Sequence, residues 1–305
     1  MIKIITVLGG SGFIGRTLAV RLARAGYAVR LLTRTREHTK SLWTLPDLDV
    51  REIDVYDAAP LTKALAGSAA VINLVGILRE TPRQTFVRTH VLLSQEVVAA
   101  CAEAGVTRLL HMSALNADPA GPSDYLRSKS EGEAAVRTSN LHWTIFQPSV
   151  VFGPDDGFLN LFARWLPRLP LLPVPSAQTR FQPVYVGDVA DAFCRALSRG
   201  STVGKTLPLG GPRVYRLDEL LRWLGKTIGS PRPVFSTPAA LAPLQAWLLE
   251  HLPGQLMTRD QWLSMQKDSV CPDEKATALI ELGVTPTALE EVAPRWLRSL
   301  DRSIP

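Results

Sequence analysis

Short apolar runs alternate with amphipathic stretches over the first half of this chain. The runs are rich in β-branched residues and leucine, as the buried strands of a parallel sheet are. The stretches between them carry apolar side chains at helical spacing, and glycine follows several of them as a stop signal. The pattern predicts strands at residues 2–8, 28–33, 49–55, 69–76, 106–114 and 141–154. It predicts helices at residues 12–25, 61–67, 84–104 and 123–139.

Regular alternation of strand and helix predicts an α/β fold, a doubly wound parallel sheet of Rossmann type with helices on both faces. Ligands on such sheets bind at the carboxyl ends of the strands. After about residue 150 prolines become dense, and the remainder from about 203 reads as helical. Residues 181–197 read as a strand and a helix that return to the main sheet. We therefore expect a dinucleotide-binding domain at 1–150 and 181–202, and a smaller, mainly helical C-terminal lobe at 151–180 and 203–305.

Composition narrows the functional classes. The 305 residues carry a formal charge of +6, but Lys and Arg are scattered, so we expect anionic small molecules rather than nucleic acid as ligands. The three cysteines lie far apart without metal-ligand spacing, and they are expected to be reduced core thiols. No apolar stretch is long enough to span a bilayer. A cytoplasmic protein is expected, with peripheral attachment to a membrane as the alternative; the apolar segment 158–175 either packs over the cleft or touches that membrane.

Gly9, Gly12 and Gly15 form a G-x-x-G-x-x-G spacing between the first strand and the first helix. Missing Cβ atoms let a pyrophosphate approach the backbone, and the helix presents its N–H groups and positive dipole end to that anion. Glycines alone also make ordinary turns, but here they lie inside a complete β-α-β unit. The sequence therefore predicts a dinucleotide site.

The end of the second strand bears on the choice of dinucleotide. An acidic residue there would select NAD, whereas this chain has Arg34 and Arg36, with Arg16 just after the glycines. Guanidinium groups match a 2′-phosphate in charge and geometry, so NADP(H) is favoured and NAD(H) stays as the alternative. Asp54, at the end of the third strand, either reaches the adenine amine or is a plain turn residue. The pair Asp155 and Asp156 is expected to cap a helix that begins near residue 157.

Tyr125 and Lys129 lie four residues apart on one predicted helix and so share a face. Ser113 ends the fifth strand. A lysine ammonium beside a phenol is expected to lower the pKa of that phenol, which can then exchange a proton with a carbonyl or alcohol oxygen while a nicotinamide exchanges a hydride. The serine hydroxyl can hold the same oxygen. The spacing is common by chance, and its value comes from its place beyond the carboxyl ends of neighbouring strands.

This arrangement resembles the extended or atypical branch of the short-chain dehydrogenase/reductase superfamily. The resemblance covers the first 200 residues, through GGSGFIGR (9–16), NLVG (73–76), HMSA (111–114), YLRSK (125–129), QPSVVFGP (147–154) and QPVYVGDVA (182–190). Within that branch, YLRSKSEGE, FGPDDGFLNLFARW and TRDQWLSMQKDSVC are similar to a subgroup that includes the nucleotide-binding accessory subunit of respiratory complex I and relatives tied to coenzyme Q biosynthesis.

The resemblance implies roles for individual residues. Ser113, Tyr125 and Lys129 would be catalytic, Lys129 would also reach the nicotinamide ribose, and Arg34 would bind the 2′-phosphate. Together, the residue patterns and the resemblance give the expected cofactor-binding set: Gly9, Gly12, Phe13, Ile14, Gly15, Arg16, Arg34, Asp54, Val55, Val75, Gly76, Lys129, Pro148 and Ser149. No metal site is expected.

One departure from the family pattern leaves the function open. Many extended members have an Asn that holds a proton-relay water where this chain has His90, which is either a substitute proton shuttle or, as we favour, a structural histidine. The first hypothesis is an NADP(H)-dependent oxidoreductase acting on an unknown small-molecule carbonyl or alcohol. A nucleotide-sugar epimerase or dehydratase is a related alternative. A third is a non-catalytic, NADPH-binding assembly or sensor protein, in contact with a membrane, respiratory complex I or the quinone-synthesis machinery. Dimers are common for such sheets, and the oligomeric state is left open.

Overall fold

The computed structural model describes residues 2–238, 240–251, 257–274 and 277–300. Its centre is a seven-stranded sheet in the order β11-β6-β5-β4-β1-β2-β3, in which every neighbouring pair is parallel. This arrangement confirms the predicted doubly wound parallel sheet. The strands are β1 (Ile4–Leu8), β2 (Ala28–Thr33), β3 (Leu48–Glu52), β4 (Ala70–Asn73), β5 (Arg108–Met112), β6 (His142–Pro148) and β11 (Lys205–Leu209).

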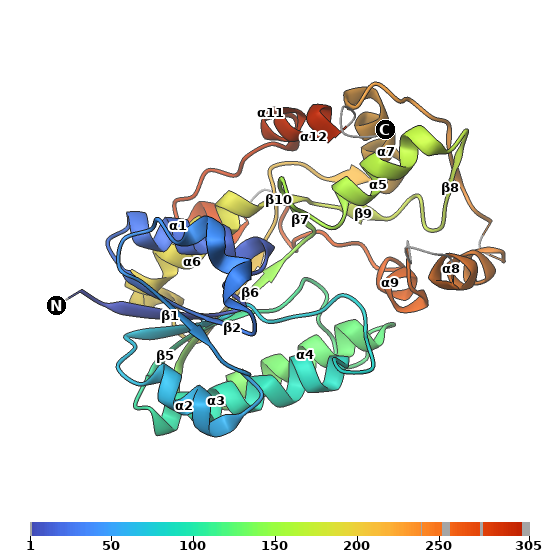
Figure 1. The fold of residues 1–305 in the computed structure, drawn as a ribbon. Helices are drawn as coiled ribbons and strands as arrows, with labels where there is room; N and C mark the ends of the chain where they lie inside the picture. The colour runs from blue at the N-terminus through green and yellow to red at the C-terminus, as the bar shows by residue number, and fades with distance from the viewer. Residues whose placement is uncertain (1, 239, 252–256, 275–276, 301–305) are drawn as a thin grey trace.

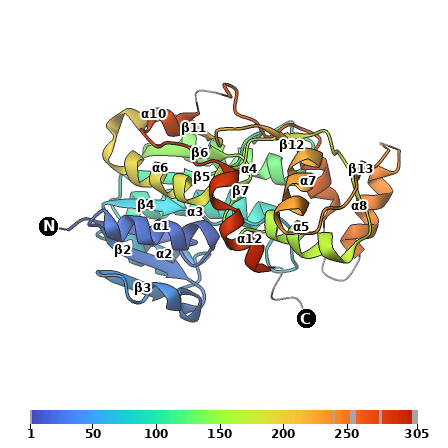
Figure 2. The same ribbon diagram turned by 90° about the horizontal axis from the view of Figure 1, so that it is seen from above.

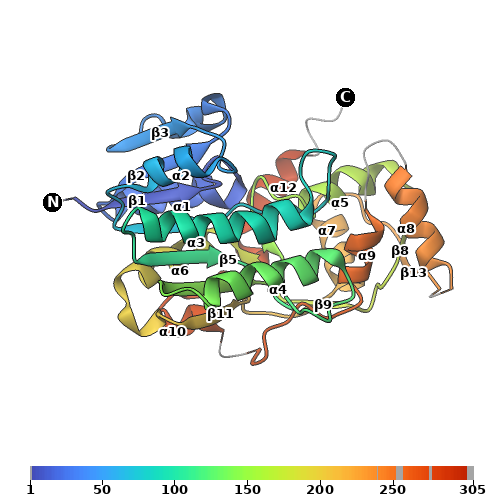
Figure 3. The same ribbon diagram turned by 90° about the horizontal axis from the view of Figure 1, so that it is seen from below.

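Helices cover both faces of the sheet (Figures 1 and 3). On one face α1 (Phe13–Arg24) packs against α6 (Val186–Ser198), and fully buried leucine and phenylalanine side chains fill the space beneath them. The other face carries α2 (Ala58–Leu65), α3 (Leu93–Glu103) and α4 (Asp124–Arg137) over a second apolar cluster. A sheet that is buried on both sides explains why its strands read as continuous apolar runs in the sequence.

The predicted long helix at 84–104 begins differently. Residues Val87–Leu92 form a π-helical turn, labelled η2, which leads directly into α3. π-turns inside helices occur often at functional sites. Here the turn places His90 against α4. The two backbones lie so close that a Cβ atom on Gly132 of α4 would be only 2.3 Å from the His90 carbonyl oxygen.

The smaller lobe lies beyond the carboxyl ends of the sheet strands (Figures 1 and 2). Three two-stranded sheets and several helices build it around its own apolar core. The pairs join β7 (Val151–Phe152) with β10 (Val184–Tyr185), β9 (Arg180–Phe181) with β12 (Tyr215–Arg216), and β8 (Leu172–Val174) with β13 (Val234–Ser236). The helices are α5 (Leu159–Trp165), α7 (Leu217–Thr227), α8 (Ala242–His251), α9 (Arg259–Ser264), α11 (Leu289–Val292) and α12 (Pro294–Leu300).

Two strand predictions need correction. The strand expected near 181 does not join the main sheet, because β9 pairs with β12 and β10 pairs with β7. The seventh strand is instead β11, which follows α6 and lies beyond the boundary expected at residue 202. The expected strand 141–154 also splits, because β7 leaves β6 to pair with β10. A further helix of the C-terminal part, α10 (Ala278–Glu281), packs on α6 and β11 and so extends the Rossmann core.

Among the described residues, none of the helices combines the length and apolar character that a bilayer crossing requires. In the same part of the chain, His, Cys, Asp and Glu nowhere gather in a group of three or more suited to a metal ion. The three cysteines are free thiols, of which two are buried and Cys194 is partly buried.

Candidate functional site

A cavity of about 530 Å³ lies between the carboxyl ends of the sheet strands and the smaller lobe. It brings together most of the residues predicted for the site, which are far apart in the sequence. Those lining it are Gly9, Gly12, Phe13, Ile14, Gly15, Gly76, Ser113, Tyr125, Lys129, Pro148 and Ser149. The Rossmann half of the cavity therefore coincides with the predicted cofactor and catalytic groups.

The glycine turn fits a dinucleotide pyrophosphate. Gly9 has a φ of +78°, which favours glycine, and a Cβ at Gly15 would lie only 2.3 Å from the carbonyl oxygen of Gly9. The N-cap of α1 is Gly12, which offers no side-chain acceptor, and the first turn of the helix holds no acidic residue. The free N–H groups at this helix end are suited to an anion.

The three arginines near the glycine turn have different environments. Arg34 is exposed at the end of β2 and makes no ion pair or hydrogen bond with any residue that the structure describes. Arg16 instead pairs with Asp155 at 2.9 Å. The Arg36 guanidinium lies 5.6 Å from the ring centre of Trp43. Arg34 is thus the arginine most available to a bound phosphate.

Five predicted cofactor residues do not line the cavity: Arg16, Arg34, Asp54, Val55 and Val75. Asp54 accepts a hydrogen bond from the backbone N–H of Tyr56 at 3.1 Å, which is the geometry of a turn residue. Val55 is buried in the core beneath the sheet. These contacts agree with the plainer interpretation of Asp54.

Of the acidic pair, Asp156 has the capping role that the sequence predicts. Its carboxylate accepts hydrogen bonds from the backbone N–H groups of Phe158, Leu159 and Asn160, and the last two begin α5. Asp155 is exposed and is engaged with Arg16. The pair therefore fixes the loop between β7 and α5 rather than providing acid–base chemistry.

Ser113, which directly follows β5, and Tyr125 and Lys129 of α4 face the same cavity. Lys129 is buried, and its Nζ donates a hydrogen bond to the Met112 carbonyl oxygen at 2.7 Å. The Ser113 Oγ is also buried but has no hydrogen-bond partner among the described residues. An orphaned buried hydroxyl is costly, so its presence in a cavity points to a ligand oxygen that would complete it.

Burial shifts the pKa values of both Lys129 and Tyr125. It lowers the pKa of Lys129 to about 8. Burial and then the nearby Asp260 carboxylate raise the pKa of Tyr125 to about 12. The expectation that Lys129 lowers the pKa of Tyr125 is therefore wrong for this structure, because desolvation and Asp260 act in the opposite direction. At neutral pH the phenol is protonated and able to donate.

His90 is held by hydrogen bonds at both ring nitrogens. Its Nε2 accepts from the Ile77 backbone N–H at 3.1 Å, so its Nδ1 carries the proton and donates to the Ser128 Oγ at 2.9 Å. Ser128 in turn donates to the Tyr125 carbonyl oxygen at 2.9 Å. Burial first, and then the Lys129 charge, lower the pKa of His90 to about 2. These contacts support a structural histidine that fixes the backbone of the helix carrying Tyr125.

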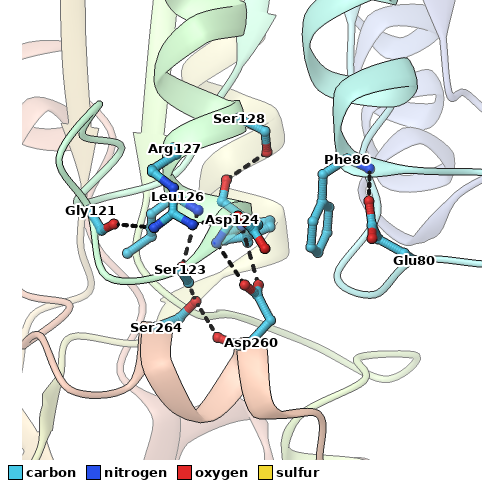
Figure 4. Close-up of polar contacts among 11 residues, drawn as sticks. Glu80, Phe86, Gly121, Ser123, Asp124, Leu126, Arg127, Ser128, Asp260 and Ser264 are labelled. Atoms are coloured by element: carbon cyan, nitrogen blue, oxygen red, sulfur yellow. Dashed lines mark hydrogen bonds and ion pairs between the residues drawn. The ribbon is translucent and has the colours of Figure 1, made fainter.

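Asp260 on α9 binds the N-terminus of α4 (Figure 4). Its carboxylate accepts from the backbone N–H groups of Asp124 at 2.7 Å and Tyr125 at 3.2 Å. Beside it, the Ser264 Oγ donates to the Ser123 Oγ at 2.7 Å. Nothing in the sequence singles out Asp260, although it lies in the segment TRDQWLSMQKDSVC that resembles the family subgroup. An acidic residue on one helix does not reveal which distant helix end it will meet.

The smaller lobe supplies the other wall of the cavity. The sequence predicted no residues for this wall. Its apolar members come from the start of α5, from β9 and from the segment around α9: Phe158, Leu161, Phe162, Phe181, Met257 and Met265. These residues follow no shared motif, because they come from three separate parts of the chain. Only the fold brings them opposite Tyr125.

Comparison with known proteins agrees with this geometry. Residues 9–157 match the NAD(P)H-binding family. The chain is 35% identical over 301 residues to the mouse mitochondrial NADH dehydrogenase [ubiquinone] 1 alpha subcomplex subunit 9, covering 93% of this chain and 77% of the relative. The chain belongs to the atypical short-chain dehydrogenase/reductases.

One further relative and one solved structure are also similar to this chain. A ceramide reductase of Caulobacter vibrioides is 29% identical over 258 residues, which is 80% of this chain and 78% of the relative. The NADPH-dependent quinone oxidoreductase of Escherichia coli, solved with NADPH, has a TM-score of 0.78 at 19% identity, covering 96% of this chain and 99% of that structure. Like other atypical short-chain dehydrogenase/reductases, the protein is thus an NAD(P)H-binding Rossmann protein.

Proposed function

We propose that this protein is an NADP(H)-dependent oxidoreductase that interconverts a carbonyl and an alcohol on a small molecule. The observation that carries the proposal concerns the Ser113 hydroxyl. It has no hydrogen-bond partner in the described part of the chain, and it shares a cavity with Tyr125, Lys129 and the glycine turn. These groups supply an oxygen anchor, a proton donor, a cation and a cofactor cradle within one site.

The protein groups would act on the oxygen of the substrate. Ser113 donates a hydrogen bond that holds the carbonyl oxygen, and Tyr125, protonated at neutral pH, donates the proton that this oxygen needs in the alcohol product. Lys129 holds a positive charge at the end of β5, where the resemblance implies contact with the nicotinamide ribose. When bound, NADPH supplies the hydride for the carbonyl carbon.

Arg34 supports the choice of NADPH over NADH. Its guanidinium is exposed just after β2 without a partner among the described residues, and residues 34–36, which follow that strand, include no acidic side chain that could accept from a ribose 2′-hydroxyl. Glu52, which lies beside this strand end, already accepts a hydrogen bond from the Arg36 backbone N–H at 2.8 Å. Nearby Arg16 is already paired with Asp155. Arg34 would therefore contribute most of the preference.

The Tyr125→Phe variant tests the proposal. It removes the proton donor while keeping the ring, so NADPH-dependent turnover of any carbonyl accepted by the wild type should fall at least ~100-fold, with NADPH affinity nearly unchanged. Tyr27→Phe is the matched control, because Tyr27 packs against the apolar core beneath α1 and does not line the cavity. Turnover retained in Tyr125→Phe would exclude the assigned role.

A second candidate is a non-catalytic NADPH-binding subunit at a membrane, a respiratory complex or a quinone-synthesis complex. Similarity to a subunit of mitochondrial NADH dehydrogenase favours it, as does the exposed apolar surface of α8. On that helix Leu244 is 56%, Trp247 46% and Leu248 49% exposed, and apolar surface of this kind marks contact sites. Purification with membranes or a partner complex, with NADPH bound and no turnover, would support this candidate, whereas an active protein without partners would reject it.

A further inference from the structure

The chemical character of the cavity restricts the substrate. Among the described residues that line it, the ionisable side chains are His90, Tyr125 and Lys129. His90 is neutral, with both ring nitrogens in hydrogen bonds, and Lys129 is directed to the Met112 carbonyl. Arginine, aspartate and glutamate are absent from this described lining.

The polar side chains on the lobe side are already paired within the protein. Gln261 donates to the Leu78 carbonyl at 3.3 Å, and Ser264 donates to Ser123 at 2.7 Å. On the Rossmann side, the Ser149 hydroxyl donates to the Ser269 carbonyl at 2.6 Å. Ser113 is thus the one buried polar side chain of the described lining that lacks a partner, and it lies at the reacting end.

The remainder of the lobe wall is aromatic, aliphatic and thioether surface. The Phe158 and Phe162 rings meet edge to face with their centroids 5.4 Å apart, and Phe181 lies 5.8 Å from Phe158. Leu161 and Met265 complete this wall. A substrate phosphate or carboxylate placed here would lose its hydration without gaining a cation, which costs several kcal/mol.

We infer that the substrate is an uncharged, apolar carbonyl or alcohol compound, with one oxygen at the Ser113 and Tyr125 end and a hydrocarbon body along the Phe158, Leu161 and Phe162 wall. The inference rests on the proposed oxidoreductase function for the reacting end, and on the lining alone for the body. It disfavours nucleotide sugars, whose diphosphate needs positive charge.

Binding to the NADPH-loaded protein tests this assignment apart from turnover. The probes are methyl ketones of increasing length (butanone, hexanone, octanone and decanone), the anionic analogue oxodecanoate with its carboxylate at the far end, and UDP-glucose. Affinity, measured by calorimetry, should rise up to roughly fourfold per added methylene. Oxodecanoate should bind at least ~10-fold more weakly than decanone. Affinity that is independent of chain length, or tighter binding of UDP-glucose, would overturn the assignment.

A charge introduced into the wall gives a second test that does not depend on loss of function. Leu161 is partly exposed, so Leu161→Lys should be tolerated and should reverse the preference from decanone to oxodecanoate. The matched control is Leu171→Lys, because Leu171 is exposed on the same lobe and does not line the cavity. An unchanged preference in Leu161→Lys would contradict the assignment.

The two proposals can fail separately. Ketones that bind with the expected chain-length dependence, without any NADPH oxidation, would support the substrate assignment and refute the oxidoreductase function. NADPH oxidation with charged carbonyl compounds in preference to the ketones would support the oxidoreductase function and refute the substrate assignment.

Discussion

Burial governs the charge state of the histidines around the site. His90 and His111 are 2% and 3% exposed, and desolvation is the main cause that lowers their pKa values to about 2 and about 3. His111 lies beside Asn73, the residue opposite it on β4. Both rings are therefore neutral at physiological pH and act as hydrogen-bonding parts of the core.

The burial of His90 predicts that the folded protein loses stability in acid. The unfolded chain binds a proton on His90 below about pH 6.5, whereas the folded protein does so only near pH 2, so stability is lost as the pH falls through this window. From about pH 8 to about pH 5, His90 should account for a loss of about 2 kcal/mol in the free energy of unfolding. His90→Asn, measured by urea denaturation at both pH values, should remove that part of the pH dependence.

The control for this experiment is His142→Asn, because His142 is exposed at the start of β6. It should retain the pH dependence of the wild type. An undiminished loss of stability in His90→Asn would show that His90 is not held neutral by the fold.

The junction between α9 and α4 couples the smaller lobe to the helix that carries Tyr125. Asp260 accepts two backbone N–H groups at the start of α4, where the helix dipole favours negative charge. The same carboxylate contributes to the raised pKa of Tyr125. Asp260 is therefore a positioning residue that also affects Tyr125, the proposed proton donor.

Asp260→Asn should reduce the free energy of unfolding by about 1 kcal/mol, because the neutral amide interacts less favourably with the helix N-terminus. It should also move the alkaline limb of the pH–rate profile to lower pH, because the negative charge beside the phenol is gone. Asp57→Asn is the matched control, since Asp57 is the N-cap of α2 but makes no side-chain capping bond. Loss of stability without any shift of the pH profile would show a purely structural role.

Sequence periodicity predicts the elements that are buried on a regular pattern and misses those that depend on tertiary contact. Strands β1 to β6 and helices α1 to α4 are found because a parallel sheet buries both faces and leaves long apolar runs. The π-helical turn at His90 depends on contact with Gly132. Residues Lys205–Leu209 became an edge strand only through pairing with β6. The glycines and the Ser, Tyr and Lys positions were identified by motif, whereas the apolar wall and Asp260 required the fold.

Across the whole protein, the C-terminal segment is joined to the Rossmann core and the smaller lobe through Gln182. This side chain is fully buried and donates to the carbonyls of Gly211 and Glu274, while its Oε1 accepts from the Cys271 N–H at 2.9 Å. Arg180 adds ion pairs with Asp268 and Glu274 nearby. The wall of the cavity therefore depends on contacts between distant parts of the chain.

Gln182→Leu should lower the free energy of unfolding by about 2–4 kcal/mol, because it leaves one N–H and two carbonyls buried without partners. The measurement is urea denaturation of the full chain. Gln178→Leu is the matched control, since Gln178 is exposed on the same segment, and it should change stability by no more than about 0.5 kcal/mol. Equal stability of the two variants would contradict the importance of this contact.

The most direct test of the account is a pair of titrations, NADPH and NADH, against the purified protein, followed by intrinsic tryptophan fluorescence. We expect a clear preference for NADPH. In Arg34→Ala, NADPH should bind roughly 10- to 100-fold more weakly, with NADH little changed, because a charge-assisted contact to the 2′-phosphate is lost. Arg24→Ala, at the far end of α1, should behave as the wild type. Tight binding of NADH alone would contradict the cofactor assignment, and binding of neither would contradict the central claim that the glycine turn holds a dinucleotide.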